Sequence, residues 1–161
     1  MKTKVAYFGV FTALALIFSY VESLIPINLG IPGVKLGFAN LIIVIALYKM
    51  SIKGAYILSV VRIVLAGFMF GNLFAILYSL SGGILSLTIM SILKKTNKFS
   101  VYGVSMAGGV FHNIGQLLTA AIVLESVSIG YYFPVLLISG LVTGFVIGVI
   151  ANEMIKRLKI L

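Results

Sequence analysis

Long apolar segments, separated by short polar breaks, make up most of this chain. Between Lys53 and Lys94, Arg62 is the only charged residue, and no charged residue lies between Lys98 and Glu125. Charged residues are 9% of the sequence, against about 25% in ordinary soluble domains. Segments of about 20 apolar residues cross a bilayer as helices, because each backbone N–H in hydrocarbon must be bonded within its own segment. The pattern predicts an all-α, polytopic membrane protein.

Six apolar segments fit transmembrane helices within a single domain of residues 1–161. The breaks between them contain glycine, proline or basic residues, which end helices or remain in water. An even number of passes returns the chain to the side on which it started. The expected helices cover residues 4–22, 33–49, 53–70, 72–93, 99–124 and 131–156.

Basic residues gather on both termini and on the second and fourth expected loops. Cytoplasmic loops of membrane proteins carry an excess of Lys and Arg, so we expect both termini of this six-helix bundle to be cytoplasmic, in a bacterial cell membrane. Of the Lys and Arg residues, only Lys35 and Arg62 fall elsewhere. The net charge of +9 therefore indicates topology rather than nucleic-acid binding. The residues that set this orientation are Lys2, Lys4, Lys49, Lys53, Lys94, Lys95, Lys98, Lys156, Arg157 and Lys159.

The second expected helix and the segment before it are unusual. Lys35 and Lys49 are separated by thirteen residues, about 20 Å of helix, which is less than the ~30 Å hydrocarbon core of a bilayer. The preceding segment contains two prolines and several glycines and has no helical period. A long apolar loop is expected to fold over the bundle rather than extend into water. We predict a lid-like external loop over residues 23–35.

Small residues recur at a helical spacing on three of the expected helices. Such stripes let helix backbones approach closely, which drives helix association where lipid supplies no hydrophobic force. The spacing fits either packing inside the bundle or docking of a partner protein. The stripes are Gly140, Gly144, Gly148 and Asn152 on the sixth helix, Gly9 and Ala13 on the first, and Ser79 and Gly83 on the fourth.

Arg62 is the one charged residue in the middle of an expected span. It lies nine residues after Lys53, roughly 13 Å into the helix, where an arginine costs at least ~2.5–3.5 kcal/mol on insertion scales. The carboxylates of the chain belong to Glu22, Glu125 and Glu153, and the expected helices place none of them at the depth of Arg62. Arg62 either bonds to carbonyl, Asn or Gln groups inside the bundle or holds an anionic ligand.

The run GVFHNIGQLL, residues 109–118, places three polar side chains within the fifth expected helix. His112 and Gln116 are four residues apart, and Asn113 and Gln116 are three apart, so these side chains lie close together on the helix surface. Either an outward-opening, ligand-filled pocket or a network of interhelical hydrogen bonds would satisfy them. The other polar candidates for substrate binding are Asn40 and Asn72.

The sequence lacks the motifs of several enzyme classes. It contains no G-x-x-x-x-G-K-[ST] loop for ATP hydrolysis. One histidine and no cysteine argue against a conventional transition-metal site. Diphosphate chemistry on magnesium uses clustered carboxylates, whereas this chain has no aspartate and three dispersed glutamates. We expect no enzymatic activity, no metal and no cofactor, and a bound isoprenoid, quinone or vitamin only as a ligand.

Four strings of this sequence resemble the Gx transporter family, often labelled heptaprenyl diphosphate synthase component I. That family is grouped with the substrate-binding S components of energy-coupling factor (ECF) transporters. The resemblance covers nearly the whole chain. The strings are PGVKLGFANL (32–41), VRIVLAGFMFGN (61–72), YSLSGGILS (78–86) and GGVFHNIGQL (108–117).

The resemblance implies a six-helix S-component fold, in which the first external loop covers an outward-opening pocket. It implies that His112, Asn113 and Gln116 reach this pocket. An S component docks on a transmembrane T component driven by two ATPase subunits, through a small-residue motif on its first helix. Gly9 and Ala13 match that motif, with glycine in place of the usual alanine at its first position.

Two functional hypotheses follow. The first is the substrate-binding subunit of an ECF-type importer that captures a small anionic isoprenoid- or quinone-related molecule or a vitamin, since Lys35, Arg62 and His112 suit an anionic head group. The second is a non-transport membrane subunit that binds a quinone for electron transfer or anchors a polyprenyl diphosphate synthase. A bundle that only scaffolds other membrane proteins is a third interpretation. The family's enzymatic label conflicts with the residues, so we interpret it as reflecting genes of isoprenoid and quinone metabolism nearby.

Overall fold

A computed structural model describes residues 2–25 and 37–158 of the chain, residues 2–4 and 127 by their backbone alone. All regular elements within this part of the chain are helical, which confirms the all-α class. They are α1 (Lys2–Leu24), α2 (Phe38–Lys49), α3 (Ile52–Phe70), α4 (Leu73–Thr96), α5 (Val101–Val123), the 3₁₀ helix η1 (Val127–Tyr132) and α6 (Phe133–Arg157).

Five of these helices, α1 and α3 to α6, are long and apolar enough to cross a membrane. The sixth expected span, over residues 33–49, is described only from Gly37 onward and is shorter there than expected. Gly37 is not helical but has a left-handed backbone, with φ of 75°, and α2 begins only at Phe38. Its 12 residues span about 18 Å, well short of a ~30 Å hydrocarbon core. This helix belongs to the interior of the bundle, where its residues from Leu41 to Leu47 are buried.

The other helix ends differ from expectation by a few residues. α1 continues through Leu24, two residues into the segment expected to be a lid, and the remainder of that segment, 26–35, lies outside the described residues. The break expected over residues 126–130 is largely the 3₁₀ helix η1, which leads directly into α6. Ser51 and Ser100 cap α3 and α5, because each hydroxyl accepts the N–H of the residue three positions later.

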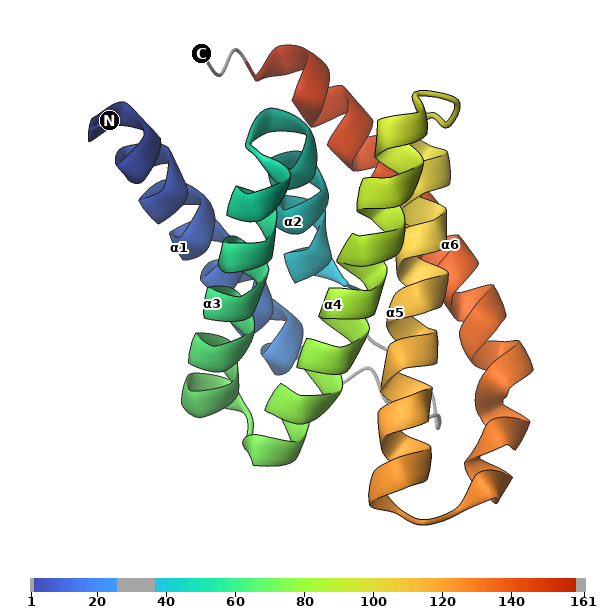
Figure 1. The fold of residues 1–161 in the computed structure, drawn as a ribbon. Coiled ribbons are helices and arrows are strands. Elements are labelled where there is room, and N and C mark those ends of the chain that lie inside the picture. Colours follow the sequence, from blue (N-terminus) through green and yellow to red (C-terminus); the bar gives the residue numbers. More distant parts are fainter. Residues whose placement is uncertain (1, 26–36, 159–161) are drawn as a thin grey trace.

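Both ends of the described chain lie at one end of the bundle, together with the α2–α3 turn and the α4–α5 loop (Figure 1). The expected basic cluster belongs to this end. Lys49 Nζ donates to the Leu158 carbonyl oxygen at 2.6 Å, and Lys94 Nζ donates to the Leu47 carbonyl oxygen at 2.5 Å. These lysines bond to carbonyls near the C-terminal ends of α6 and α2, where positive charge is favourable. We call this end of the molecule the basic end.

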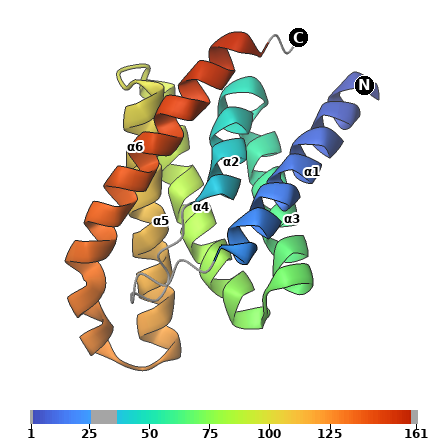
Figure 2. The ribbon, with the colours of Figure 1, turned by 180° about the vertical axis from the view of Figure 1, so that it is seen from behind.

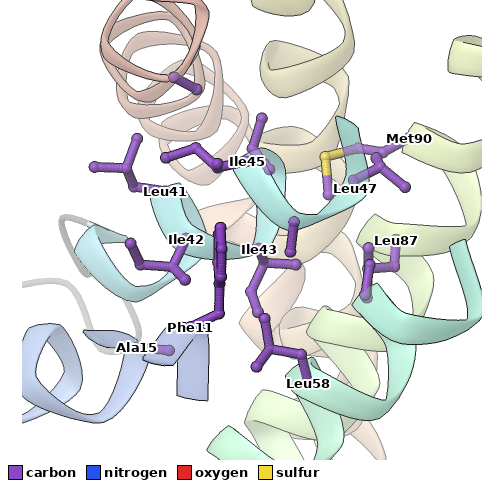
Figure 3. Packing of buried hydrophobic residues seen from close by; sticks show 14 of the residues in the cluster. Phe11, Ala15, Leu41, Ile42, Ile43, Ile45, Leu47, Leu58, Leu87 and Met90 are labelled. Carbon is purple, nitrogen blue, oxygen red and sulfur yellow. The ribbon is translucent and has the colours of Figure 1, made fainter. Parts of the chain in front are cut away.

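The hydrophobic core is centred on α2, whose residues from Leu41 to Leu47 are all buried. Phe11 and Ala15 of α1 approach α2 from one side, and Leu58 of α3 with Leu87 and Met90 of α4 approach from another (Figure 3). A helix that is apolar all round is typical of a position surrounded by other helices. The shortness and the uniform apolarity of α2 thus have one cause, its central place.

Glycines determine how closely α5 approaches its two neighbours. A Cβ at Gly144 of α6 would lie 2.7 Å from the Met106 Cα of α5, and a Cβ at Gly115 of α5 would lie 2.8 Å from the Gly82 Cα of α4. Figure 2 shows α6 crossing alongside α5, with α1 at the opposite edge. For the stripe on α6, the interpretation as internal packing is therefore confirmed.

Candidate functional site

Arg62 lies inside the bundle on α3 and is 9% exposed. Its Nη2 donates a hydrogen bond to Asn40 Oδ1 of α2 at 3.2 Å. Its Nε is buried and has no hydrogen-bond partner among the described residues. A buried donor without a partner costs stability, so a native structure that keeps one indicates a strained or functional position.

The pairing of Arg62 with Asn40 follows from the short turn between α2 and α3. Asn40 is nine residues before Lys49, and Arg62 is nine residues after Lys53. Both residues are thus about 13 Å from the basic end of two neighbouring antiparallel helices. This equal spacing is a signal in the sequence that could have identified the pair. Of the alternatives left open for Arg62, a bond to an amide side chain is present.

Glu22, near the end of α1, joins this group. Its Oε1 accepts the backbone N–H of Gly37 at 2.5 Å, directly before α2. Glu22 and Arg62 also attract each other electrostatically, although no Arg62 nitrogen lies within the 4.0 Å of a salt bridge among the described residues. The sequence placed no carboxylate at the depth of Arg62, and the structure links Glu22 to it through the first turn of α2. α2 begins deep within the bundle, and its first turn meets both residues there.

The first turn of α2 holds these groups together. Gly37 and Asn40 are joined by a backbone hydrogen bond of 2.8 Å from the Asn40 N–H to the Gly37 carbonyl. Glu22 is bonded to one end of this turn and Arg62 to the other. We call Glu22, Gly37, Asn40 and Arg62 the α2 N-terminal cluster. Glu22 and Gly37 were not among the residues predicted for the site.

His112 and Gln116 form a second polar group, on the face of α5 that packs against α4. A Cβ placed on Gly82 of α4 would lie 3.1 Å from His112 Cε1 and 3.0 Å from Gln116 Cγ. Both side chains are half-buried. The structure therefore brings these two predicted residues together at a glycine of the neighbouring helix.

Asn113 points away from this pair toward α6. Its Nδ2 donates to the Leu136 carbonyl oxygen at 2.7 Å, which links α5 to the first turns of α6. Asn72 is exposed at the turn before α4, and its Oδ1 accepts the N–H of Ala75 at 2.9 Å as an N-cap. Each of these asparagines thus has a structural role, whether or not it also meets a ligand.

A hydroxyl network next to His112 and Gln116 was missed by the sequence analysis. Thr119 Oγ1 of α5 donates to Ser81 Oγ of α4 at 2.6 Å, and Ser81 Oγ donates to the Gly115 carbonyl oxygen at 3.0 Å. Ser and Thr are frequent in membrane helices and bond to many partners, so spacing alone does not single them out. The network shows that α4 and α5 are held by polar as well as by glycine contacts.

Gly82 and Gly83 of α4 indicate how the α2 N-terminal cluster and the His112–Gln116 pair lie relative to each other. Gly82 faces His112, whereas a Cβ on Gly83 would lie 3.0 Å from Ile63 Cδ1 of α3, the residue directly after Arg62. Because these glycines are adjacent, α3 and α5 approach α4 at the same level. Arg62 and His112 therefore flank α4 at a similar depth.

Gly9 and Ala13 of α1 lie apart from both groups. Lys35 is outside the described residues. On α1, Ala13 is exposed, and a Cβ on Gly9 would meet nothing within 4 Å. The expected docking pair thus forms an open surface of the described structure.

The fold and its buried polar groups define a multi-pass, all-helical membrane protein. The sequence model of one family, heptaprenyl diphosphate synthase component I, matches residues 11–154. The chain therefore belongs to the heptaprenyl diphosphate synthase component I family. No curated protein and no solved structure matches it.

Proposed function

We propose that this protein is the membrane-embedded, S-component-like subunit of an ECF-type importer. In this role it captures a small isoprenoid- or quinone-related molecule or a vitamin from outside the cell. The observation that carries the proposal is the buried arginine of the α2 N-terminal cluster, whose Nε has no hydrogen-bond partner among the residues that the structure describes. Intramembrane charged residues are costly and mark ligand or ion sites in membrane proteins.

The energy of Arg62 supports a ligand rather than a purely structural role. An arginine within a membrane span costs at least ~2.5–3.5 kcal/mol on insertion scales. The bond to Asn40 satisfies one nitrogen of the guanidinium group, which has five N–H donors. Apolar packing alone would hold the bundle together without the energetic cost of a buried arginine. A ligand that accepts hydrogen bonds would make use of the remaining donors.

The open face of α1 supports a protein partner. Gly9 and Ala13 form a small-residue surface that no described helix covers. Another transmembrane helix could approach closely there. On this proposal the partner is an ECF T component, which is coupled to ATPase subunits that hydrolyse ATP. On this proposal the protein itself is not an enzyme, and any ATP hydrolysis belongs to the partner subunits. The dispersal of its three glutamates over α1, the residues after α5, and α6, and the lack of a phosphate-binding loop in its sequence, support this part of the proposal.

The basic end supports an orientation with both termini in the cytoplasm. Lys49, Lys53, Lys94 and Lys98 lie at the α2–α3 turn and the α4–α5 loop, at the same end as the termini. An excess of Lys and Arg marks the cytoplasmic side of a bacterial cell membrane. The α2 N-terminal cluster would then lie in the bundle interior, beyond the cytoplasmic half of α3.

The name of the family favours a second candidate function. A chain described as component I of a heptaprenyl diphosphate synthase is expected to have a protein partner with synthase activity. In that case the bundle anchors a polyprenyl diphosphate synthase at the membrane, where long isoprenoid products accumulate. The two functions differ in which small molecule or protein subunits co-purify with the protein when it is extracted from its membrane.

Native mass spectrometry of the full chain, gently extracted from its own membrane, tests the proposal. We expect a bound small molecule that is lost in Arg62→Gln and retained in Arg157→Gln, an exposed arginine of α6 that serves as the control. Co-purifying T-component and ATPase subunits would support the importer. An empty bundle that carries a prenyl synthase would overturn the importer in favour of the anchor.

A further inference from the structure

The α2 N-terminal cluster contains its own anion. The N-terminus of a helix attracts negative charge, because its first N–H groups are unpaired and the helix dipole is positive there. At α2 this position is taken by the carboxylate of Glu22, which accepts the Gly37 N–H at 2.5 Å.

Arg62 of α3 and Glu22 of α1 both bond to the first turn of α2. Arg62 bonds to Asn40, which in turn donates its backbone N–H to the Gly37 carbonyl. A negative and a positive side chain thus bond to the same turn of α2. No salt bridge of 4.0 Å or less joins them among the described residues. A second negative charge here would be repelled by Glu22, and in a medium of low dielectric constant such repulsion is strong.

A head group without net charge would meet no such repulsion. A hydroxyl group is both a donor and an acceptor. It can accept from Arg62 Nε, which has no partner among the described residues, and donate to Glu22 Oε2, since the bond to Gly37 uses Oε1. Each charged residue would gain a hydrogen bond, and the balance of charge in the bundle would not change.

We propose that Glu22 determines the specificity of this site, by selecting ligands whose polar head is uncharged, such as an alcohol, over those with an anionic head. The inference rests on the proposed capture function and narrows its substrate class. The sequence alone favoured an anionic ligand because Lys35, Arg62 and His112 suit an anionic head group. In the structure, Glu22 places a negative charge on the same turn of α2 to which Arg62 bonds.

Two probes with the same hydrocarbon tail, geraniol and geranyl diphosphate, test this inference by native mass spectrometry of the full chain. We expect the wild-type protein to bind geraniol more tightly than the diphosphate. In Glu22→Gln, Arg62 is left without its counter-charge, and the ratio of the two affinities should shift toward the diphosphate by about 30-fold or more, the size of effect that follows loss of one partner of a buried charge pair. Glu22→Asp keeps the charge and should keep the wild-type preference.

A double variant, Glu22→Gln with Arg62→Gln, covers the case in which Glu22→Gln alone does not fold. Without either charge the site should discriminate between the probes by less than about threefold, since only neutral hydrogen bonds remain. Discrimination equal to that of the wild-type protein would overturn the inference.

The outcomes separate this inference from the proposed function. A wild-type protein that prefers geranyl diphosphate, with no further gain in Glu22→Gln, overturns the role of Glu22 and leaves ligand capture intact. Binding of neither probe by any folded variant overturns isoprenoid capture and the inference with it. Reversal of the preference by Glu22→Gln supports both.

Discussion

Two helices carry small residues at a spacing of four, and the structure gives them opposite surroundings. On α6, a Cβ at Gly140 would lie 2.8 Å from the Gly109 carbonyl oxygen of α5, and a Cβ at Gly148 would lie 2.6 Å from the Tyr102 Cα. On α1, a Cβ at Gly9 would meet nothing within 4 Å, and Ala13 is exposed. The same pattern in the sequence marks a closed interface in one place and an open surface in the other.

The two stripes differ in whether another helix of the described structure packs against them. α5 presents Gly109 and the backbone of Ser105 and Met106 to the glycines of α6, so small residues meet on both sides of that interface. α1 packs Phe11 and Ala15 against α2 and leaves Gly9 and Ala13 outside. A small-residue stripe therefore indicates internal packing when the same chain supplies a matching backbone. A stripe on the outer face is available to another protein.

The largest effect is expected at the closed interface, from Gly144→Leu. A Cβ there would lie 2.7 Å from both the Met106 Cα and the Ser105 carbonyl oxygen, and backbone atoms cannot move aside as a side chain can. We expect a loss of about 3 kcal/mol or more in the free energy of unfolding, at the upper end of overpacking costs. Thermal unfolding in detergent measures this. A variant as stable as the wild-type protein would show that α6 does not pack closely on α5.

A smaller effect is expected from Thr119→Val, which tests how far hydrogen bonds add to glycine contacts. The change removes the 2.6 Å bond from Thr119 to Ser81 between α5 and α4. Interhelical bonds of this kind contribute about 0.6–1.7 kcal/mol in membrane proteins. Thr143→Val is the matched control, because the Thr143 hydroxyl bonds only to carbonyls of its own helix. Equal unfolding free energies for the two variants would argue against an α4–α5 network.

A still smaller effect is expected from Gly108→Ala. A Cβ at this position would lie 2.8 Å from Met90 Cγ and 3.2 Å from Ser86 Oγ, which are side-chain atoms of α4. Methionine is flexible and adapts to irregular space, so the cost should be about 1 kcal/mol or less. Gly144→Ala, where the new methyl group meets backbone, should cost more when both are measured by thermal unfolding. The reverse order would mean that Met90 cannot move.

Much of the fold could be predicted because membrane helices are long and almost purely apolar. The all-helical class, the long helices and the gathering of basic residues near the α2–α3 and α4–α5 connections follow from that contrast. The start of α2 could not be predicted in this way. The residues after Gly37 are apolar, and only the left-handed backbone of that glycine, with φ of 75°, fixes where the helix begins.

The candidate site was predicted in part for a related reason. Arg62 and Asn40 stood out as polar residues in apolar helices, and the structure joins them. The sequence placed Glu22 at the end of the first helix, away from Arg62. Counting residues along straight helices does not show where the short central helix α2 begins. Because α2 begins inside the bundle, backbone N–H groups at its start need partners there, and Glu22 accepts the N–H of Gly37.

The smallest effect on stability, and the sharpest test of the open surface, is expected from Gly9→Leu. A leucine would meet no neighbouring atom of the described structure, so the free energy of unfolding should change by no more than about 0.5 kcal/mol. If a T component docks on this face, the same change should abolish co-purification of that subunit and leave ligand affinity unaltered. Val10→Leu, on an exposed residue next to Gly9, is the control and should preserve association. Association that survives Gly9→Leu would exclude α1 as the docking face, and the two stripes would then differ in packing without differing in function.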